Sequence, residues 1–317
     1  MPARHPLRGY LYIAGATFFW GISASLGRAV FTGRLFPSAQ AWPPIDPLIL
    51  AQSRTTFSLI VLAPILFSRR GRELFSLPKL DVWRCLLLGT LGVAASNYFY
   101  YLAIQKTNVA TAIIIQYTAP VWVLLYMVAR GLQAPTAQRI FSVGLAVVGS
   151  ALAIGFVGHG GLRFSTLGIA AAMLAAFSFA FYNVYGHGIL SRYDRWKILV
   201  FTLGGAVLCW LIINPPWKIA AAHYAPAQWA FLVVFAVASV LIPFSFYFSG
   251  LQHLDATRAI VTSCLEPVFS ILIAAITLGE IVRPLQALGI VIVLAATVLV
   301  QLPGKQPEQA VAVEPIE

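Results

Sequence analysis

The sequence predicts an all-α polytopic membrane protein with ten transmembrane helices, arranged as two inverted five-helix repeats, and with both termini in the cytoplasm. Three observations support this fold class: long apolar segments along nearly the whole chain, few charged residues, and similarity between the two halves. Of 317 residues, 60% are hydrophobic and 10% are charged, and the mean hydropathy is +0.84. Because a soluble domain carries roughly a quarter charged residues, this composition excludes a soluble protein.

Each of the ten segments is long enough to cross a bilayer, since a helix needs about 20 apolar residues to span a hydrocarbon core of about 30 Å. Helices are expected because lipid offers no hydrogen-bond partner to free backbone groups. The first span is too long for a signal peptide and lacks a small-residue cleavage pattern, so we expect an uncleaved anchor. The expected spans are Tyr10–Phe31, Leu48–Ser68, Arg84–Ile104, Asn108–Ala129, Arg139–Val157, Leu167–Leu190, Ile198–Ile213, Trp229–Leu251, Ala256–Leu278 and Pro284–Leu302.

Lys and Arg residues predict the orientation of these spans. With the N-terminus inside, most cations fall on inner loops and helix ends, including the Arg69–Arg84 loop, and few fall outside. This asymmetry satisfies the positive-inside rule. The net charge of +11 is then a set of topology signals spread over separate loops, so we expect no nucleic-acid partner.

Few residues in the chain could support catalysis or metal binding. Cys85, Cys209 and Cys264 fall inside predicted spans without the spacing of metal ligands, and we expect them to be packing residues. His187 is the one histidine inside a span and has no second ligand at helical spacing. We therefore expect no metal, no cofactor and no enzymatic activity. The absence of a GxxxxGK[ST] motif argues against ATP as the energy source.

The second half of the chain repeats the first. With an offset of 147 residues, the segment NYFYYLAIQKTNVATAIIIQYTAPV that starts at Asn97 aligns without a gap with FSFYFSGLQHLDATRAIVTSCLEPV, which starts at Phe244. We expect residues 1–157 to form the first five-helix repeat, residues 158–303 the second, and residues 304–317 a disordered cytoplasmic tail. Five spans per repeat place the halves in opposite directions, which is typical of secondary transporters.

The order and duplication of loose apolar motifs resemble an EamA-type member of the drug/metabolite transporter superfamily. The resemblance extends from Tyr10 to Leu302 and implies ten helices, cytoplasmic termini, and export or exchange of small metabolites. One position departs from the pattern: the family tends to carry Glu at the end of the fourth and ninth spans, where this chain has Gln133 and Glu280. The motifs are FFWGIS (Phe18–Ser23), QSRTTFSLIVLAP (Gln52–Pro64), YYLAIQKTNVATA (Tyr100–Ala112) and LEPVFSILIAAITLGE (Leu265–Glu280).

Three ionisable residues lie deep enough in the predicted spans to require a partner or a wet cavity, at a cost of roughly 2.5–3.5 kcal/mol each. Arg28 is either an interfacial cation that snorkels to the surface or a substrate contact. Arg54 pairs with a carboxylate or with helix C-terminal carbonyls, or it contacts the substrate. Glu266, directly before Pro267, is either a coupling or ammonium-binding site or a structural carboxylate satisfied by neighbouring hydroxyls.

Aromatic and neutral polar residues are dense where the two repeats should face one another. A single ring is more often a packing or interfacial-belt residue than part of a ligand cage, whereas a buried amide must find hydrogen bonds. Such a cavity suits an amphipathic solute, for example a neutral amino acid, better than a sugar phosphate. The expected substrate-binding residues are Trp20, Asn97, Tyr98, Tyr101, Gln116, Tyr117, Phe181, Tyr182, Phe244 and Ser263, with Glu266 and Arg54 for coupling or charge pairing.

The sequence therefore predicts a multi-pass secondary transporter of the bacterial inner membrane that works by alternating access and exports amino acids or related amphipathic solutes. The alternative is an organic-anion or phosphorylated-solute exchanger that uses Arg54 and Arg28. A receptor or scaffold also stays open, although the repeat favours a carrier. The expected partners are a small-molecule substrate and the lipid bilayer, with a homodimer left open.

Overall fold

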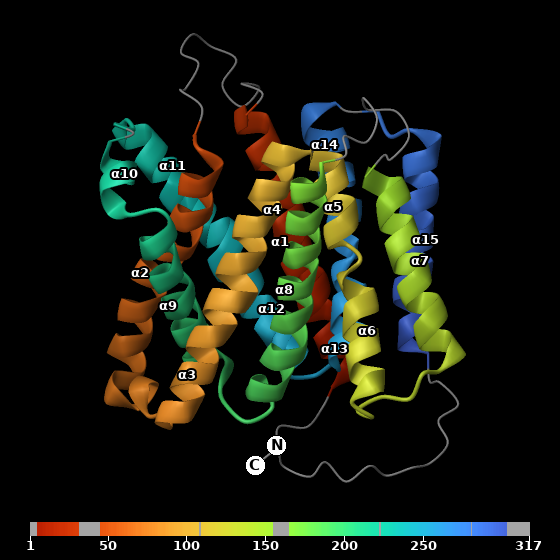
Figure 1. Cartoon of the computed structure of the whole chain (residues 1–317), viewed down its shortest axis with the longest axis horizontal. Helices are drawn as coiled ribbons and strands as arrows, with labels where there is room; N and C mark the ends of the chain where they lie inside the picture. Colours follow the sequence, from red (N-terminus) through yellow and green to blue (C-terminus); the bar gives the residue numbers. More distant parts are fainter. Residues whose placement is uncertain are drawn as a thin grey trace.

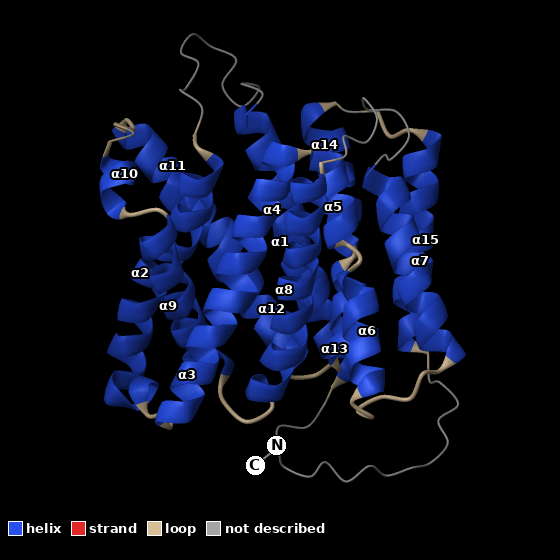
Figure 2. Cartoon of the chain, viewed as in Figure 1, coloured by secondary structure: helices blue, strands red, loops and turns tan. Residues whose placement is uncertain are grey.

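The computed structural model describes residues 5–31, 45–107, 109–154, 165–221, 223–279 and 281–302, and these residues form a bundle of helices without strands (Figures 1 and 2). The elements are α1 (Pro6–Phe31), α2 (Pro47–Arg70), η1 (Gly71–Phe75), α3 (Lys79–Leu87), η2 (Leu88–Ala94), α4 (Ala95–Lys106), α5 (Val109–Gln116), α6 (Ala119–Ala129), α7 (Ala137–Ile154), α8 (Thr166–Leu190), α9 (Arg195–Ile213), α10 (Pro216–Ala220), α11 (Pro226–Ala236), η3 (Val237–Leu241), α12 (Ile242–Leu251), α13 (Ala256–Ser263), α14 (Leu265–Leu278) and α15 (Pro284–Gln301). The predicted tail, Glu280 and the side chain of Arg28 lie outside the described residues.

Within the described ranges, nine helical stretches are long and apolar enough to cross a membrane, and they coincide with the second to tenth predicted spans. Large apolar side chains cover the outside of the bundle, among them Ile212, Val234 and Ile276, as expected for a surface in contact with lipid. The polytopic all-α class is thereby confirmed. Helix α1, at 26 residues, packs along α12 and α14, and its role as a tenth crossing stays a prediction.

Both ends of the described chain lie at the same end of the bundle. The His5 ring is 6.3 Å from that of His253 in the α12–α13 loop, and the carbonyl of Leu302 accepts a hydrogen bond from Gln138 at the start of α7. We call this the basic end. It also includes the α2–α3, α6–α7 and α8–α9 loops (Figure 1), and its assignment to the cytoplasm stays a prediction.

The acidic residues of the basic end tie its loops together. Asp194 pairs with Arg70 at 2.6 Å, joining the α8–α9 loop to α2. The Tyr193 hydroxyl donates a hydrogen bond to Asp81 at 2.5 Å, and this bond raises the pKa of Tyr193. Arg84 is paired with the same carboxylate at 2.9 Å.

Irregular backbone recurs at the same offset that relates the two halves of the sequence. Two π-helices interrupt the bundle, η2 and η3, and a shift of 147 residues places the last five residues of η2 on the five residues of η3. Turns at Tyr117–Thr118 and at Cys264 are related by the same shift. Since π-helices mostly occur as isolated insertions and often at functional sites, their recurrence supports the repeat, while its boundaries at residues 157 and 303 stay predictions.

Glycine permits the closest helix contact in the bundle. A Cβ atom on Gly89 in η2 would lie 1.9 Å from the carbonyl oxygen of Thr202 in α9, and one on Gly205 would lie 2.3 Å from that of Leu86. The Thr90 hydroxyl donates to the Gly205 carbonyl at 3.2 Å. Small residues that allow backbones to meet are typical of helix packing in membranes, and here they bring η2 and α9 into direct backbone contact.

Candidate functional site

A cavity of about 1150 Å³ lies in the middle of the bundle and receives side chains from both halves of the chain. Trp20 of α1, Arg54 of α2 and Asn97 of α4 line it from the first half, and Tyr182 of α8 and Glu266 of α14 line it from the second. This volume is slightly above the roughly 300–1,000 Å³ typical of small-molecule sites.

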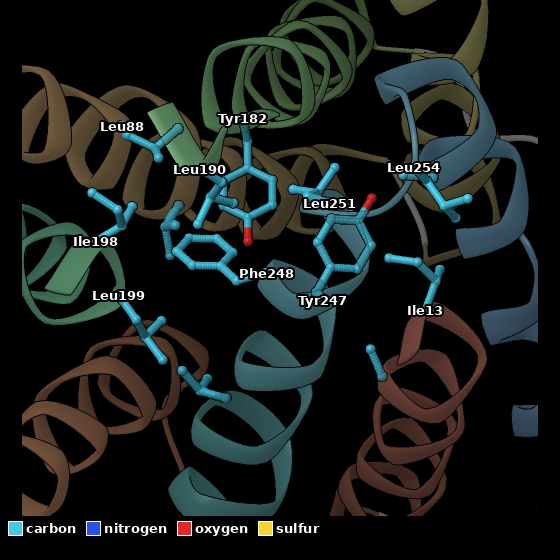
Figure 3. Close-up of a cluster of buried hydrophobic side chains, with 14 of the residues drawn as sticks. Ile13, Leu88, Tyr182, Leu190, Ile198, Leu199, Tyr247, Phe248, Leu251 and Leu254 are labelled. Atoms are coloured by element: carbon cyan, nitrogen blue, oxygen red, sulfur yellow. The ribbon is translucent and has the colours of Figure 1, made fainter. Parts of the chain in front are cut away.

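The cavity extends toward the end of the bundle opposite the basic end. Its lining there includes Ile281, Val282 and Arg283, just before α15. Toward the basic end it is closed by a packed layer in which the Tyr182 ring lies 5.9 Å from Tyr247 and 5.7 Å from Phe248. Figure 3 shows this layer continuing through aliphatic residues such as Leu190 and Leu251. Among the described residues, the cavity therefore reaches one end of the bundle and is closed at the basic end.

Glu266 reaches the cavity because the ninth span is broken. The chain turns at Cys264, and Glu266 falls in the first turn of α14, where the partial positive charge of a helix N-terminus favours a carboxylate. The Tyr117 hydroxyl lies within hydrogen-bonding reach of this carboxylate. The neighbouring Thr262 hydroxyl instead donates to the Arg258 carbonyl at 2.7 Å. The partner of Glu266 thus comes from the opposite repeat.

Arg54 is held by neutral groups. Its Nε donates to the Ser239 hydroxyl at 2.7 Å, and its Nη2 donates to the Ser239 carbonyl at 3.0 Å. Ser239 belongs to η3, and the guanidinium also lies 5.5 Å from the ring centre of Phe235. The sequence suggested a carboxylate or a carbonyl as the partner of Arg54. The structure provides the Ser239 carbonyl, which belongs to a π-helix, together with the Ser239 hydroxyl.

The two mid-span amides line the cavity and donate hydrogen bonds within the protein. Asn97 donates to the Val93 carbonyl at 2.7 Å, and Gln116 donates to the Ser96 hydroxyl at 3.4 Å. The ring of Trp20 lies 5.7 Å from Phe244. The remaining predicted residues on the cavity wall are Tyr101, Tyr117, Tyr182, Phe244 and Ser263.

Tyr98 and Phe181 were expected at the site but do not line this cavity. Each is one residue from a lining position, and one residue turns a helix by about 100°. Tyr98 therefore packs against the core with its neighbour Phe99, and Phe181 stacks on Tyr185 at 4.9 Å. Gln133, the departure from the family pattern, lies away from the cavity and accepts a hydrogen bond from Thr257 at 2.7 Å.

Several lining residues were not singled out from sequence. Tyr100 and Ser96 lie one turn apart on α4, beside Asn97 and Tyr101. Their i, i+4 spacing places them on one stripe of the helix, next to the stripe of Asn97 and Tyr101, and this spacing could have identified them from the sequence. Arg283 precedes α15, and it was not selected from the sequence because it lies in an expected outer loop. Thr55, Phe179 and Gln286 also line the cavity without having been selected.

In the described ranges, no three His, Cys, Asp or Glu side chains gather in a way that could hold a metal ion. Cys85 and Cys264 are buried, Cys209 is half-buried, and all three are free. The wall of the cavity combines aromatic rings, neutral hydrogen-bonding groups and charges of both signs.

Comparison with known proteins gives one family over both halves of the chain. The EamA-like transporter family matches residues 7–155 and, separately, residues 166–302. An uncharacterized inner membrane transporter of Salmonella typhimurium, YicL, is 22% identical over 96% of this chain and 98% of its own. An uncharacterized transporter of Archaeoglobus fulgidus is 24% identical over 66% of this chain and 74% of its own. A protein of known crystal structure, 19% identical, shares the fold with a TM-score of 0.75 over 95% of this chain and 98% of that one.

Proposed function

The chain belongs to the EamA-like transporter family, and we propose that it is a secondary transporter of small amphipathic solutes, with neutral amino acids as the favoured class. It works by alternating access, and the name of the Salmonella relative supports a bacterial inner membrane as its location. The observation that carries the proposal is the presence of opposite charges, Arg54 and Glu266, in one aromatic-walled cavity.

These two charges can recognise the two ends of a zwitterion. Among the ion pairs of the described residues, none joins Arg54 to Glu266, and Ser239 occupies only the Nε and Nη2 groups of the guanidinium. A solute carboxylate can therefore bond to the rest of the Arg54 fork, since arginine suits carboxylates geometrically. A solute ammonium group would face Glu266 and the Tyr117 hydroxyl.

The aromatic rings can receive the apolar side chain of such a solute. Trp20, Tyr101 and Phe244 present ring surface in the same cavity. Ligand sites of this kind combine mostly apolar walls with a few placed polar groups that fix orientation. A sugar phosphate fits less well, because Glu266 would repel its charge.

The observed conformation fits the release step of an exporter. The cavity is closed at the basic end, which the positive-inside rule assigns to the cytoplasm, and it extends toward the other end. An exporter that takes up its solute from the cytoplasm would release it from this state.

An organic-anion or phosphorylated-solute exchanger is the second candidate, because Arg283 gives the cavity wall a second cation. The side chain of Arg28, which the sequence suggested for this role, lies outside the described residues. The two candidates make opposite predictions for Glu266: an ammonium group requires its charge, whereas a phosphate dianion benefits from its removal.

Counterflow into proteoliposomes that contain the purified protein tests the proposal. We expect internal leucine or phenylalanine to accelerate uptake of the labelled amino acid, and internal glucose 6-phosphate to leave it unchanged. Arg54→Gln and Gln116→Leu should impair uptake without lowering the yield of folded protein, whereas Tyr98→Leu, outside the cavity, is the control. Counterflow with the sugar phosphate alone would favour the second candidate, and wild-type uptake by Arg54→Gln would remove the carboxylate site.

A further inference from the structure

A second, smaller cavity forms a groove on the flank of the bundle near the basic end. Its volume is about 390 Å³, and it lies between α1 and α12. Arg8, Leu11, Tyr12 and Gly15 line it at i, i+3, i+4 and i+7 positions of one helix, and Phe246 completes it from the other. The groove therefore runs along the axis of α1 and is separate from the central cavity.

The groove is apolar and borders the lipid-facing side of α1. Leu7 is 71% exposed and Leu11 64% exposed, which is expected of residues that face hydrocarbon. Gly15 leaves the floor open: a Cβ atom there would lie 3.4 Å from the Phe246 ring. Tyr12 lies 6.1 Å from the same ring. An apolar chain from the bilayer is the occupant that this surface can hold.

Two arginines and two histidines gather where the groove meets the basic end. His253 interacts electrostatically with His5, Arg8 and Arg195, and its ring stacks on Tyr12 at 6.1 Å, which joins the charged cluster to the groove. In the described chain, His253 Nδ1 and Arg195 Nε are buried without a hydrogen-bond partner.

The described acidic residues of the basic end do not form ion pairs with this cluster. Across the described ranges, they are paired with other cations: Asp194 with Arg70, Asp81 with Arg84, Glu73 with Lys197 and Asp255 with Arg258. An anion is therefore the complementary ligand for His5, Arg8, His253 and Arg195.

We propose that this groove binds an anionic phospholipid, with its phosphate at Arg8 and His253 and an acyl chain against Leu11, Gly15 and Phe246. From Arg8 to Gly15 the helix rises about 10 Å, so a lipid that places its phosphate at Arg8 brings the upper part of its chain to Gly15. Basic pockets between transmembrane helices on the cytoplasmic side recognise anionic head groups in the same way.

Thermal unfolding of the purified full chain in a maltoside detergent tests this site, because a ligand of the native state raises the unfolding midpoint. We expect dioleoyl phosphatidylglycerol to raise the midpoint, and dioleoyl phosphatidylcholine and inorganic phosphate to leave it unchanged. Arg8→Gln should weaken the apparent affinity for phosphatidylglycerol about fivefold, the effect of losing one cation near an anionic surface. Gly15→Leu should abolish the shift by filling the groove.

Gly144→Leu is the matched control, since Gly144 lies in α7 at a similar distance from the basic end with open space around it, and it should respond as the wild type does. Equal shifts with both lipids, or a wild-type response of Arg8→Gln, would overturn the proposal. A full shift with inorganic phosphate alone would show a free-anion site instead of a lipid site. Should Gly15→Leu fail to fold, Arg8→Gln decides alone.

Discussion

At the scale of single residues, Arg54 and Glu266 in the central cavity both have neutral partners. Glu266 has the N-terminus of α14 and the Tyr117 hydroxyl, and Arg54 has the hydroxyl and carbonyl of Ser239. Neutral partners lower the cost of placing a charge in the membrane without cancelling its field. Both residues can therefore still attract the opposite charge of a solute.

Glu266→Gln distinguishes a role of Glu266 in proton coupling from a purely structural role. Gln keeps the shape of the side chain and can accept the hydrogen bond of Tyr117, but it cannot release a proton. We expect the variant to fold and to exchange solute, and to lose the acceleration that an inward or outward proton gradient produces in the wild type. Proteoliposome uptake with and without an imposed pH gradient measures this. If the variant keeps the acceleration, Glu266 is not the coupling group, and if the wild type ignores the gradient, the protein is an exchanger or facilitator.

His253 makes stability depend on pH. Burial of the imidazole, and repulsion from His5, Arg8 and Arg195, lower the pKa of His253 below its usual 6.5, while the Asp255–Arg258 pair lies two residues away along the chain. The folded state thus resists a proton that the unfolded chain accepts, so stability is lost as pH falls below about 6.5.

We expect His253→Gln to show a smaller drop in unfolding midpoint on acidification than the wild type, measured in detergent without anionic lipid. His223→Gln, which replaces a histidine near α10 and α11 at the other end of the bundle, controls for the chemical change. A wild-type pH dependence in His253→Gln would contradict this account.

At the scale of elements, the two π-helices make unequal contacts. η2 meets α9 through Gly89, which lies against the Thr202 backbone, and α9 meets α3 through Gly205, which lies against the Leu86 backbone. α2 meets η3 and the end of α11 through polar groups: Arg54 donates to Ser239 of η3, and Ser58 donates to the carbonyl of Ala236, the last residue of α11, at 3.1 Å. The offset of 147 places Gly205 on Ser58, so related positions carry a close contact in one repeat and a polar contact in the other.

Gly89→Ala should destabilise the protein, because its Cβ would lie 1.9 Å from the Thr202 carbonyl oxygen and the helices must separate, at a cost of about 1–3 kcal/mol. Gly204→Ala, also in α9 but with open space around it, should be neutral or stabilising by up to about 1 kcal/mol. Unfolding midpoints of the two variants give the comparison. Equal midpoints would show that η2 and α9 are not held in close contact.

At the scale of the whole molecule, the bundle has two chemically different ends. The described chain begins and finishes at the basic end, and the central cavity extends toward the other. The distribution of cations predicts that the basic end faces the cytoplasm. The proposed direction of transport and the leaflet of the proposed lipid site both depend on this orientation.

Cysteine labelling in intact cells tests the orientation. Ala221→Cys, exposed beyond α10, should react with an impermeant thiol reagent applied outside, and Ser76→Cys, exposed in the α2–α3 loop, should not. The half-buried Cys209 is replaced by Ser in both variants to remove background. Labelling at Ser76→Cys without labelling at Ala221→Cys would invert the predicted topology. Ser38, in the first predicted outer loop, lies outside the described residues.

The sequence by itself determined the class of protein, nine helical segments to within a few residues, and the repeat offset of 147. These properties follow from apolar length and composition, because hydrocarbon admits only helices of about 20 residues here. It also identified Arg54 and Glu266, because a charge inside an apolar run stands out without any knowledge of the fold.

Only the tertiary structure decided which faces of the helices meet around a cavity. Helical spacing groups Asn97 with Tyr101 but gives no rotation of α4 toward its neighbours, so Tyr98 was expected at the cavity and Tyr100 was not. The Ser239 partner of Arg54 and the Tyr117 partner of Glu266 come from the opposite repeat. The groove beside α1 also requires Phe246 from a helix far along the chain. Contacts between distant segments depend on packing in three dimensions, which no local pattern of residues encodes.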